Sequence, residues 1–153
     1  MAEGIFQSIA RKKQYGHLID RIDSCGTGAY HVGEGPDSRT MATLQKNGIT
    51  DYVHSARKVQ PSDFDRFDYI FAMDRSNLSD LQSMRQQRDK SKGEPRAKVM
   101  LFGEYSDSGK AEVVHDPYYG GNEGFEEAYK RCLAYTNNFL AALTKEKEGK
   151  EDN

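Results

Sequence analysis

The chain has 153 residues, and its 22 basic and 24 acidic side chains leave a formal charge of −2. This near balance, without a basic stripe carrying interleaved aromatic residues, excludes the strongly cationic surface that nucleic-acid-binding domains present. The longest apolar runs, 69–73 and 139–143, are too short to cross a membrane, and the first residues carry no secretory signal. We therefore expect one soluble, cytoplasmic and monomeric domain.

In chain order, the first half predicts helix, strand and helix. Residues 2–13 place apolar side chains on one helical face; these are Ile5, Phe6, Ile9 and Ala10. Residues 18–26 alternate apolar and polar side chains and end at a glycine, which predicts a short strand. Residues 36–48 begin with Pro-Asp and end with Asn-Gly, which are helix start and stop signals.

The second half predicts strand, helix, strand and a long final helix. The apolar run 67–73 predicts a buried strand and 74–88 the helix that follows it. Residues 90–96 form a linker, and 97–105 predict a second apolar strand.

The final helix is the clearest element of the sequence. Apolar residues recur at three- and four-residue steps and predict one buried stripe, made of Phe125, Tyr129, Cys132, Leu133, Thr136, Phe139, Leu140 and Leu143. The charged residues 145–153 predict a disordered tail, so the predicted domain spans residues 1–144.

Strands that alternate with helices predict an α/β fold with a mostly parallel sheet and a ligand site at the carboxyl ends of its strands. The segment 115–121, His-Asp-Pro-Tyr-Tyr-Gly-Gly, lies between the last strand region and the last helix. Asp-Pro and Gly-Gly are ordinary turn residues, so a turn with surface tyrosines is the simplest interpretation. Its place in the fold makes Asp116 a candidate for the ligand site.

Five segments in order resemble the low-molecular-weight protein tyrosine phosphatases. They are residues 1–6, 23–39, 54–59, 67–81 and 115–121. The resemblance runs from the first residue to about residue 143. It implies a three-layer, flavodoxin-like parallel sheet flanked by helices, and phosphotyrosine hydrolysis through a cysteinyl-phosphate without metal or cofactor. It implies phosphotyrosine proteins or small aryl phosphates as substrates.

The resemblance also implies roles for individual residues. Asp116 is the proton donor to the leaving oxygen and later activates the attacking water. Four residues line the substrate cleft: Tyr30, His31, Tyr118 and Tyr119. Ser24 and His54 support the phosphate-binding loop, although Tyr30 also fits the edge of the core and His54 also fits a purely structural histidine.

The family's Cys-x5-Arg nucleophile loop does not occur in these 153 residues. The residue six positions after Cys25 is His31, and the residue six positions after Cys132 is Asn138. We expect the loop and the central first strand to be missing from this chain, so that the chain as printed is inactive and folds poorly. The free energy lost with a central strand is comparable with the whole free energy of unfolding of a domain, which is ~5–15 kcal/mol.

Two other functions stay open. A non-catalytic relative would bind phosphorylated or other anionic partners in the same cleft. An arsenate reductase would use the same fold and the same Cys-x5-Arg loop, although the paired tyrosines after Asp-Pro favour an aryl ester.

Overall fold

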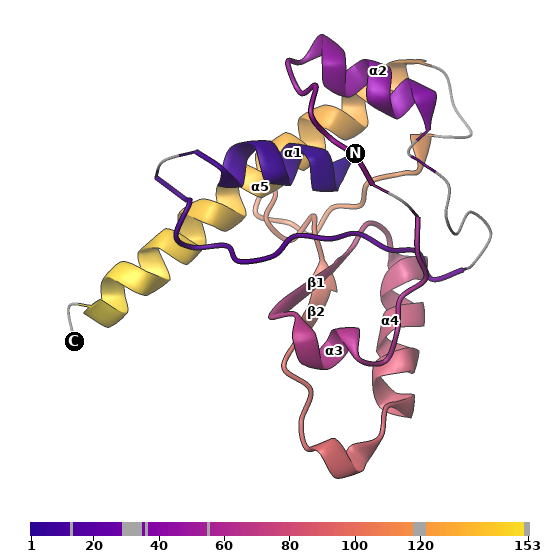
Figure 1. Ribbon diagram of the computed structural model, residues 1–153, viewed down its shortest axis with the longest axis vertical. Coiled ribbons are helices and arrows are strands. Elements are labelled where there is room, and N and C mark those ends of the chain that lie inside the picture. Colours follow the sequence, from indigo (N-terminus) through magenta and orange to yellow (C-terminus); the bar gives the residue numbers. More distant parts are fainter. Residues whose placement is uncertain (13, 29–34, 36, 55, 118–121, 152–153) are drawn as a thin grey trace.

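The computed structural model describes residues 1–12, 14–28, 35, 37–54, 56–117 and 122–151 (Figure 1). The elements follow one another as α1 (Ala2–Ala10), α2 (Ser38–Lys46), α3 (Asp63–Arg66), β1 (Tyr69–Ala72), α4 (Arg75–Gln87), a short 3-10 helix η1 (Lys90–Lys92), β2 (Lys98–Leu101) and α5 (Asn122–Glu151). The predicted α/β fold with a parallel sheet and flanking helices is confirmed.

In the described residues the sheet consists of β1 and β2, which run parallel in a register from Tyr69 opposite Lys98 to Ala72 opposite Leu101. Helix α4 is the crossover between them and packs on both strands. Leu81 is the buried residue of α4, and it belongs to a small core. The other buried residues of this core come from the two strands and from the chain before β1; they are Val59, Phe64, Ala72 and Leu101. The predicted strand at 67–73 is confirmed, but it is fully buried only at Ala72.

The larger core forms where α1 and α2 pack against α5 (Figure 1), and Tyr69 and Phe71 of β1 pack against it from the sheet. The predicted stripe of α5 is confirmed, since each of its residues is buried or half-buried. Two further buried residues of α5, Ala128 and Tyr135, were absent from the predicted stripe. Tyr135 is tolerated inside because its hydroxyl donates a 2.8 Å hydrogen bond to the carboxylate of Glu112.

Two aspartates set the starts of the middle helices. The side chain of Asp37 accepts from Arg39 N–H at the start of α2, and that of Asp74 accepts from Asn77 N–H at the start of α4. Gly48, just after α2, has φ +86°, a conformation that favours glycine. The predicted ends of these helices are therefore confirmed to within a few residues.

The predicted strand at 18–26 is wrong. The segment makes only one isolated parallel bridge, between Gly26 and Lys58, in which Gly26 N–H donates to Arg57 O and Val59 N–H donates to Gly26 O, both at 2.9 Å. A strand needs a neighbour along its length, and local alternation of side chains does not supply one.

The second predicted strand, 97–105, is shorter than expected and ends at Leu101, because Glu104 N–H and Tyr105 N–H already turn back onto Leu101 O and Phe102 O. The predicted linker 90–96 contains η1.

Helix α5 continues to Glu151, through the segment predicted to be a disordered tail, and its residues 145–150 are exposed. The division of the chain at residue 144 stays a prediction. None of the helices in the described part of the chain is both long and apolar enough to span a membrane.

Candidate functional site

The carboxyl end of β1 positions the segment that carries Asp116. Val114 N–H donates a 2.8 Å hydrogen bond to the carbonyl of Met73, the residue that follows β1. Pro117 packs against the first turn of α5, where a Cβ added to Gly124 would lie 3.6 Å from Pro117 Cβ. Asp116 is therefore held, exposed, between the carboxyl edge of the sheet and the start of α5, which is where open α/β sheets place their ligands.

All four predicted cleft residues lie outside the described residues; they are Tyr30, His31, Tyr118 and Tyr119. Their roles stay predictions.

Ser24 and His54 are the predicted site residues that the structure brings together. Ser24 Oγ lies 3.3 Å from His54 Nε2. The two residues come from extended segments, and the bridge between Gly26 and Lys58 ties these segments together a few residues further along each. The tertiary fold thus brings a hydroxyl and an imidazole together, while the role of both residues in supporting a phosphate-binding loop stays a prediction.

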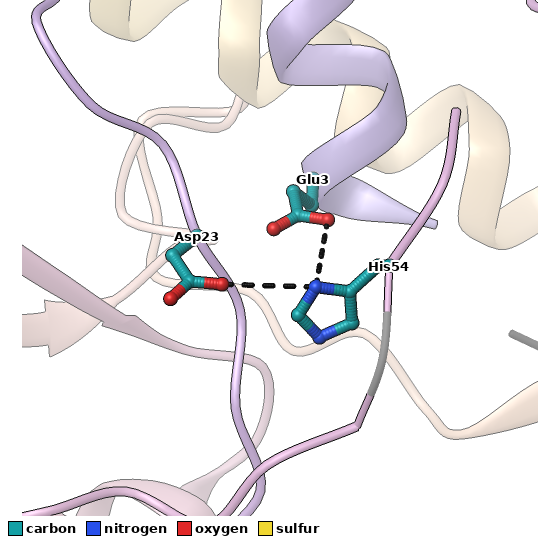
Figure 2. A group of neighbouring side chains, drawn as sticks. All are labelled: Glu3, Asp23 and His54. Carbon is teal, nitrogen blue, oxygen red and sulfur yellow. Dashed lines mark ion pairs between the residues drawn. The ribbon is translucent and has the colours of Figure 1, made fainter. Parts of the chain in front are cut away.

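Two carboxylates beside His54 were not predicted. Glu3 comes from the first turn of α1 and Asp23 from the segment before Ser24, and both point at the imidazole (Figure 2). His54 Nδ1 lies 3.3 Å from Glu3 Oε2 and 3.7 Å from Asp23 Oδ1. The sequence held one signal for the burial of Glu3. This residue stands three positions before Phe6, at the edge of the apolar face of α1.

Arg57 extends this group to a second buried carboxylate. Its Nε donates to Asp23 Oδ2 at 2.9 Å, while its two terminal nitrogens bind the carboxylate of Asp63 at 2.9 and 3.2 Å. The bonds to Asp63, followed by those to Asp23, raise the pKa of Arg57. The guanidinium therefore stays charged and fixes the orientation of both carboxylates.

The two carboxylates beside His54 have opposite pKa shifts. Burial raises the pKa of Glu3, although a hydrogen bond from Tyr52 and the nearby His54 oppose it. Burial would also raise the pKa of Asp23, but hydrogen bonds from Ser24 N–H and Arg57 outweigh it, so that this pKa lies below its ordinary value. Asp23 is thus the stable anion of the pair.

Neither cysteine has the environment of a reactive thiolate. Cys132 is buried on α5, and burial raises its pKa to about 11. Cys25 lies at the surface, yet surrounding protein atoms desolvate its thiol and raise its pKa despite the opposing charge of Arg57. Nucleophilic cysteines require a lowered pKa, so neither residue is prepared for attack on phosphorus.

Comparison with known proteins identifies the family. A sequence model described as low molecular weight phosphotyrosine protein phosphatase matches residues 1–149. The chain belongs to this family. It is 48% identical over 143 residues to a low molecular weight phosphotyrosine protein phosphatase of Schizosaccharomyces pombe, covering 94% of this chain and 87% of the relative. The human phosphatase of the same description is 36% identical over 140 residues, covering 92% of this chain and 84% of the relative.

Solved structures agree with this assignment. A protein tyrosine phosphatase from Entamoeba histolytica superposes with a TM-score of 0.81 at 29% identity, covering 95% of this chain and 88% of that one. A Drosophila protein described as an arginine phosphatase superposes with a TM-score of 0.80 at 34% identity, covering 92% of this chain and 87% of that one. Both confirm the predicted fold.

Proposed function

We propose that this protein is a protein-tyrosine phosphatase that hydrolyses phosphotyrosine through a cysteinyl-phosphate. Asp116 serves as its general acid and base. The observation that carries the proposal is the position of Asp116, held between the carboxyl end of β1 and the start of α5 in a chain of the phosphatase family. A carboxyl group exposed at the ligand edge of the sheet is able to reach the leaving oxygen of a bound ester.

Two proton transfers follow from this position. In the first step a thiolate attacks phosphorus, and Asp116 gives its proton to the phenolate oxygen that leaves. In the second step the Asp116 carboxylate takes a proton from water as the water attacks the cysteinyl-phosphate, which frees the thiolate and inorganic phosphate. Tyr30, His31, Tyr118 and Tyr119 form the walls around the aryl group in this proposal, and Ser24 and His54 support the phosphate-binding loop.

The thiolate requires a Cys-x5-Arg loop, and no such sequence occurs within these 153 residues. Successive backbone N–H groups of such a loop bind phosphate oxygens, and its arginine clamps two of them. Because the pKa of Cys25 and that of Cys132 are both raised, neither replaces the missing nucleophile. The 153-residue chain by itself is therefore proposed to have no turnover, and a chain that also carries the loop is proposed to be active.

The substrate is proposed to be a phosphotyrosine protein or a small aryl phosphate, hydrolysed without a cofactor by a cytoplasmic monomer. The similarity to a protein described as an arginine phosphatase makes phosphoarginine the second candidate. A phosphoramidate has a basic nitrogen as its leaving atom, so it also needs a proton donor at the position of Asp116.

The test compares the printed chain with the same chain extended by an apolar strand and a Cys-x5-Arg loop of the family type. We expect turnover of p-nitrophenyl phosphate and of phosphotyrosine only from the extended chain. In that chain Asp116→Asn should lower phosphotyrosine turnover by ~10²–10⁴-fold, because general acid catalysis contributes about that factor. Asp80→Asn, an exposed change on α4, serves as the matched control and should leave turnover unchanged.

A series of aryl phosphates decides the role of Asp116. The loss in Asp116→Asn should shrink as the leaving phenolate becomes more acidic, since a good leaving group needs the proton least. An equal loss across the series would mean that Asp116 only positions its loop. Binding of phosphotyrosine peptides without turnover by the extended chain would favour the non-catalytic function, and thiol-dependent reduction of arsenate would favour the reductase.

A further inference from the structure

The three side chains in Figure 2 have the spacing of a metal site. Glu3, Asp23 and His54 each offer one ligand atom, and these atoms all lie within 4.8 Å of one another. His54 Nδ1 is 3.3 Å from Glu3 Oε2 and 3.7 Å from Asp23 Oδ1. Tetrahedral Zn²⁺, with bonds of ~2.0–2.1 Å to imidazole nitrogen and carboxylate oxygen, separates neighbouring ligand atoms by about 3.3–3.5 Å. Two of the three separations between ligand atoms are therefore within a few tenths of an ångström of those in a zinc site.

A buried acceptor points into this space. The side chain of Glu3 is 3% exposed, and its Oε2 has no hydrogen-bond partner among the described residues. His54 Nδ1 is near enough for an ion pair but does not meet hydrogen-bond geometry. A buried carboxylate oxygen without a hydrogen bond is costly, and a bound cation removes that cost.

The surroundings of the three side chains match the outer shell of a metal site. Nε2–H of His54 is in a position to donate to Ser24 Oγ at 3.3 Å, which leaves the lone pair of Nδ1 directed towards the carboxylates. Asp23 is held by Ser24 N–H at 2.8 Å and by Arg57 Nε at 2.9 Å. Such hydrogen bonds fix the tautomer of a ligating histidine and the orientation of a ligating carboxylate.

We propose that Glu3, Asp23 and His54 bind one divalent transition-metal ion, with Zn²⁺ the best match, and that water occupies the fourth position. Mixed nitrogen and oxygen donors in a three-residue set suit Zn²⁺ better than Mg²⁺ or Ca²⁺, which prefer oxygen alone. The sequence predicted no metal, because the three ligands come from separate segments without a recognisable motif. The ion takes no part in the proposed phosphatase chemistry, although it shares His54 and Ser24 with the proposed support of the phosphate-binding loop. The rival arrangement has a proton on His54 Nδ1, so that the imidazolium itself is the cation between the carboxylates.

The experiment titrates the metal-free, full 153-residue chain with Zn²⁺ and measures binding by calorimetry and equilibrium dialysis. We expect one Zn²⁺ per chain at this site and a rise in the thermal midpoint on saturation. Glu3→Gln and His54→Gln should each weaken binding by at least ~10-fold, since even outer-shell changes cost a metal site 10–100-fold. The control chain combines His17→Gln, His115→Gln and Cys25→Ser, which removes exposed groups that bind zinc adventitiously, and it should bind normally.

A second measurement needs no variant. In the chain with ¹⁵N-labelled histidine, saturating Zn²⁺ should shift the Nδ1 resonance of His54 and leave its Nε2 protonated. The proposal is overturned if the chain binds no stoichiometric Zn²⁺, or if the ring of His54 is unchanged when Zn²⁺ is bound. It is equally overturned if the control chain loses binding while folded Glu3→Gln and His54→Gln retain it.

Discussion

The pair between Arg57 and Asp63 should contribute more stability than any exposed ion pair of this chain. The side chain of Asp63 is 4% exposed and that of Arg57 is 31% exposed, and two hydrogen bonds of 2.9 and 3.2 Å join them. Arg57→Met keeps the aliphatic stem and removes the guanidinium. Among the described residues, Asp63 would then keep only the N–H of Gln60, at 2.7 Å, and Asp23 would lose its 2.9 Å bond from Arg57.

The expected loss follows from the geometry. Removing one partner of a fully buried pair costs ~3–5 kcal/mol. Because about a third of the Arg57 side chain is exposed, water reaches the site, and we discount the loss in the free energy of unfolding to about 2–3 kcal/mol. Arg96→Met is the matched control. Its partner is Asp68, at 2.6 Å, and both side chains are about two-thirds exposed, so its loss should stay below ~1 kcal/mol.

The assay is urea unfolding of both variants, followed by circular dichroism, with Asp63→Asn and the double variant Arg57→Met/Asp63→Asn added. In the double variant the buried charge of Asp63 is removed together with the guanidinium, and Asp23 keeps its 2.8 Å bond from Ser24 N–H, so we expect the loss in the free energy of unfolding to be smaller than the sum of the two single losses. A loss for Arg57→Met within ~0.5 kcal/mol of that for Arg96→Met, or additive losses in the cycle, would refute the reasoning.

Three further outcomes test other parts of the structure. Gly103→Ala should lower the free energy of unfolding by at least ~2 kcal/mol in urea melts, since the new Cβ would lie 1.9 Å from the Glu112 carbonyl oxygen, whereas Gly149→Ala meets open space and should not destabilise. The raised pKa of Glu3 favours its protonated form in the folded state, so ionisation should destabilise the fold. As the pH rises above 4.5, the ordinary pKa of a glutamate, thermal melts should therefore show the wild type losing stability relative to Glu3→Gln. With a thiol reagent under native conditions Cys25 should react alone, and Cys132 only after denaturation; rapid reaction of both would contradict the packing of α5.

The sequence alone determined the elements that depend on local pattern. The apolar stripe of α5, the aspartate caps of α2 and α4 and the apolar run of β1 all depend on residues within a few positions of each other. Hydrogen bonds and side-chain packing inside one element repeat at fixed spacing, so they are readable from the chain order. The family segments also predicted Asp116, Ser24 and His54 as site residues, and their roles stay predictions.

Only the tertiary structure decided which distant residues meet. Residues 18–26 have the alternation of a strand, but a strand exists only with a partner along its length, and the segment pairs at Gly26 alone. The meeting of Glu3 and His54 depends on how α1 packs near the segment that follows α2, and no local pattern encodes that distance. A carboxylate on a short helix is by itself an ordinary surface residue. Burial gives Glu3 its raised pKa, against the opposing effect of His54, and leaves its Oε2 without a hydrogen bond among the described residues.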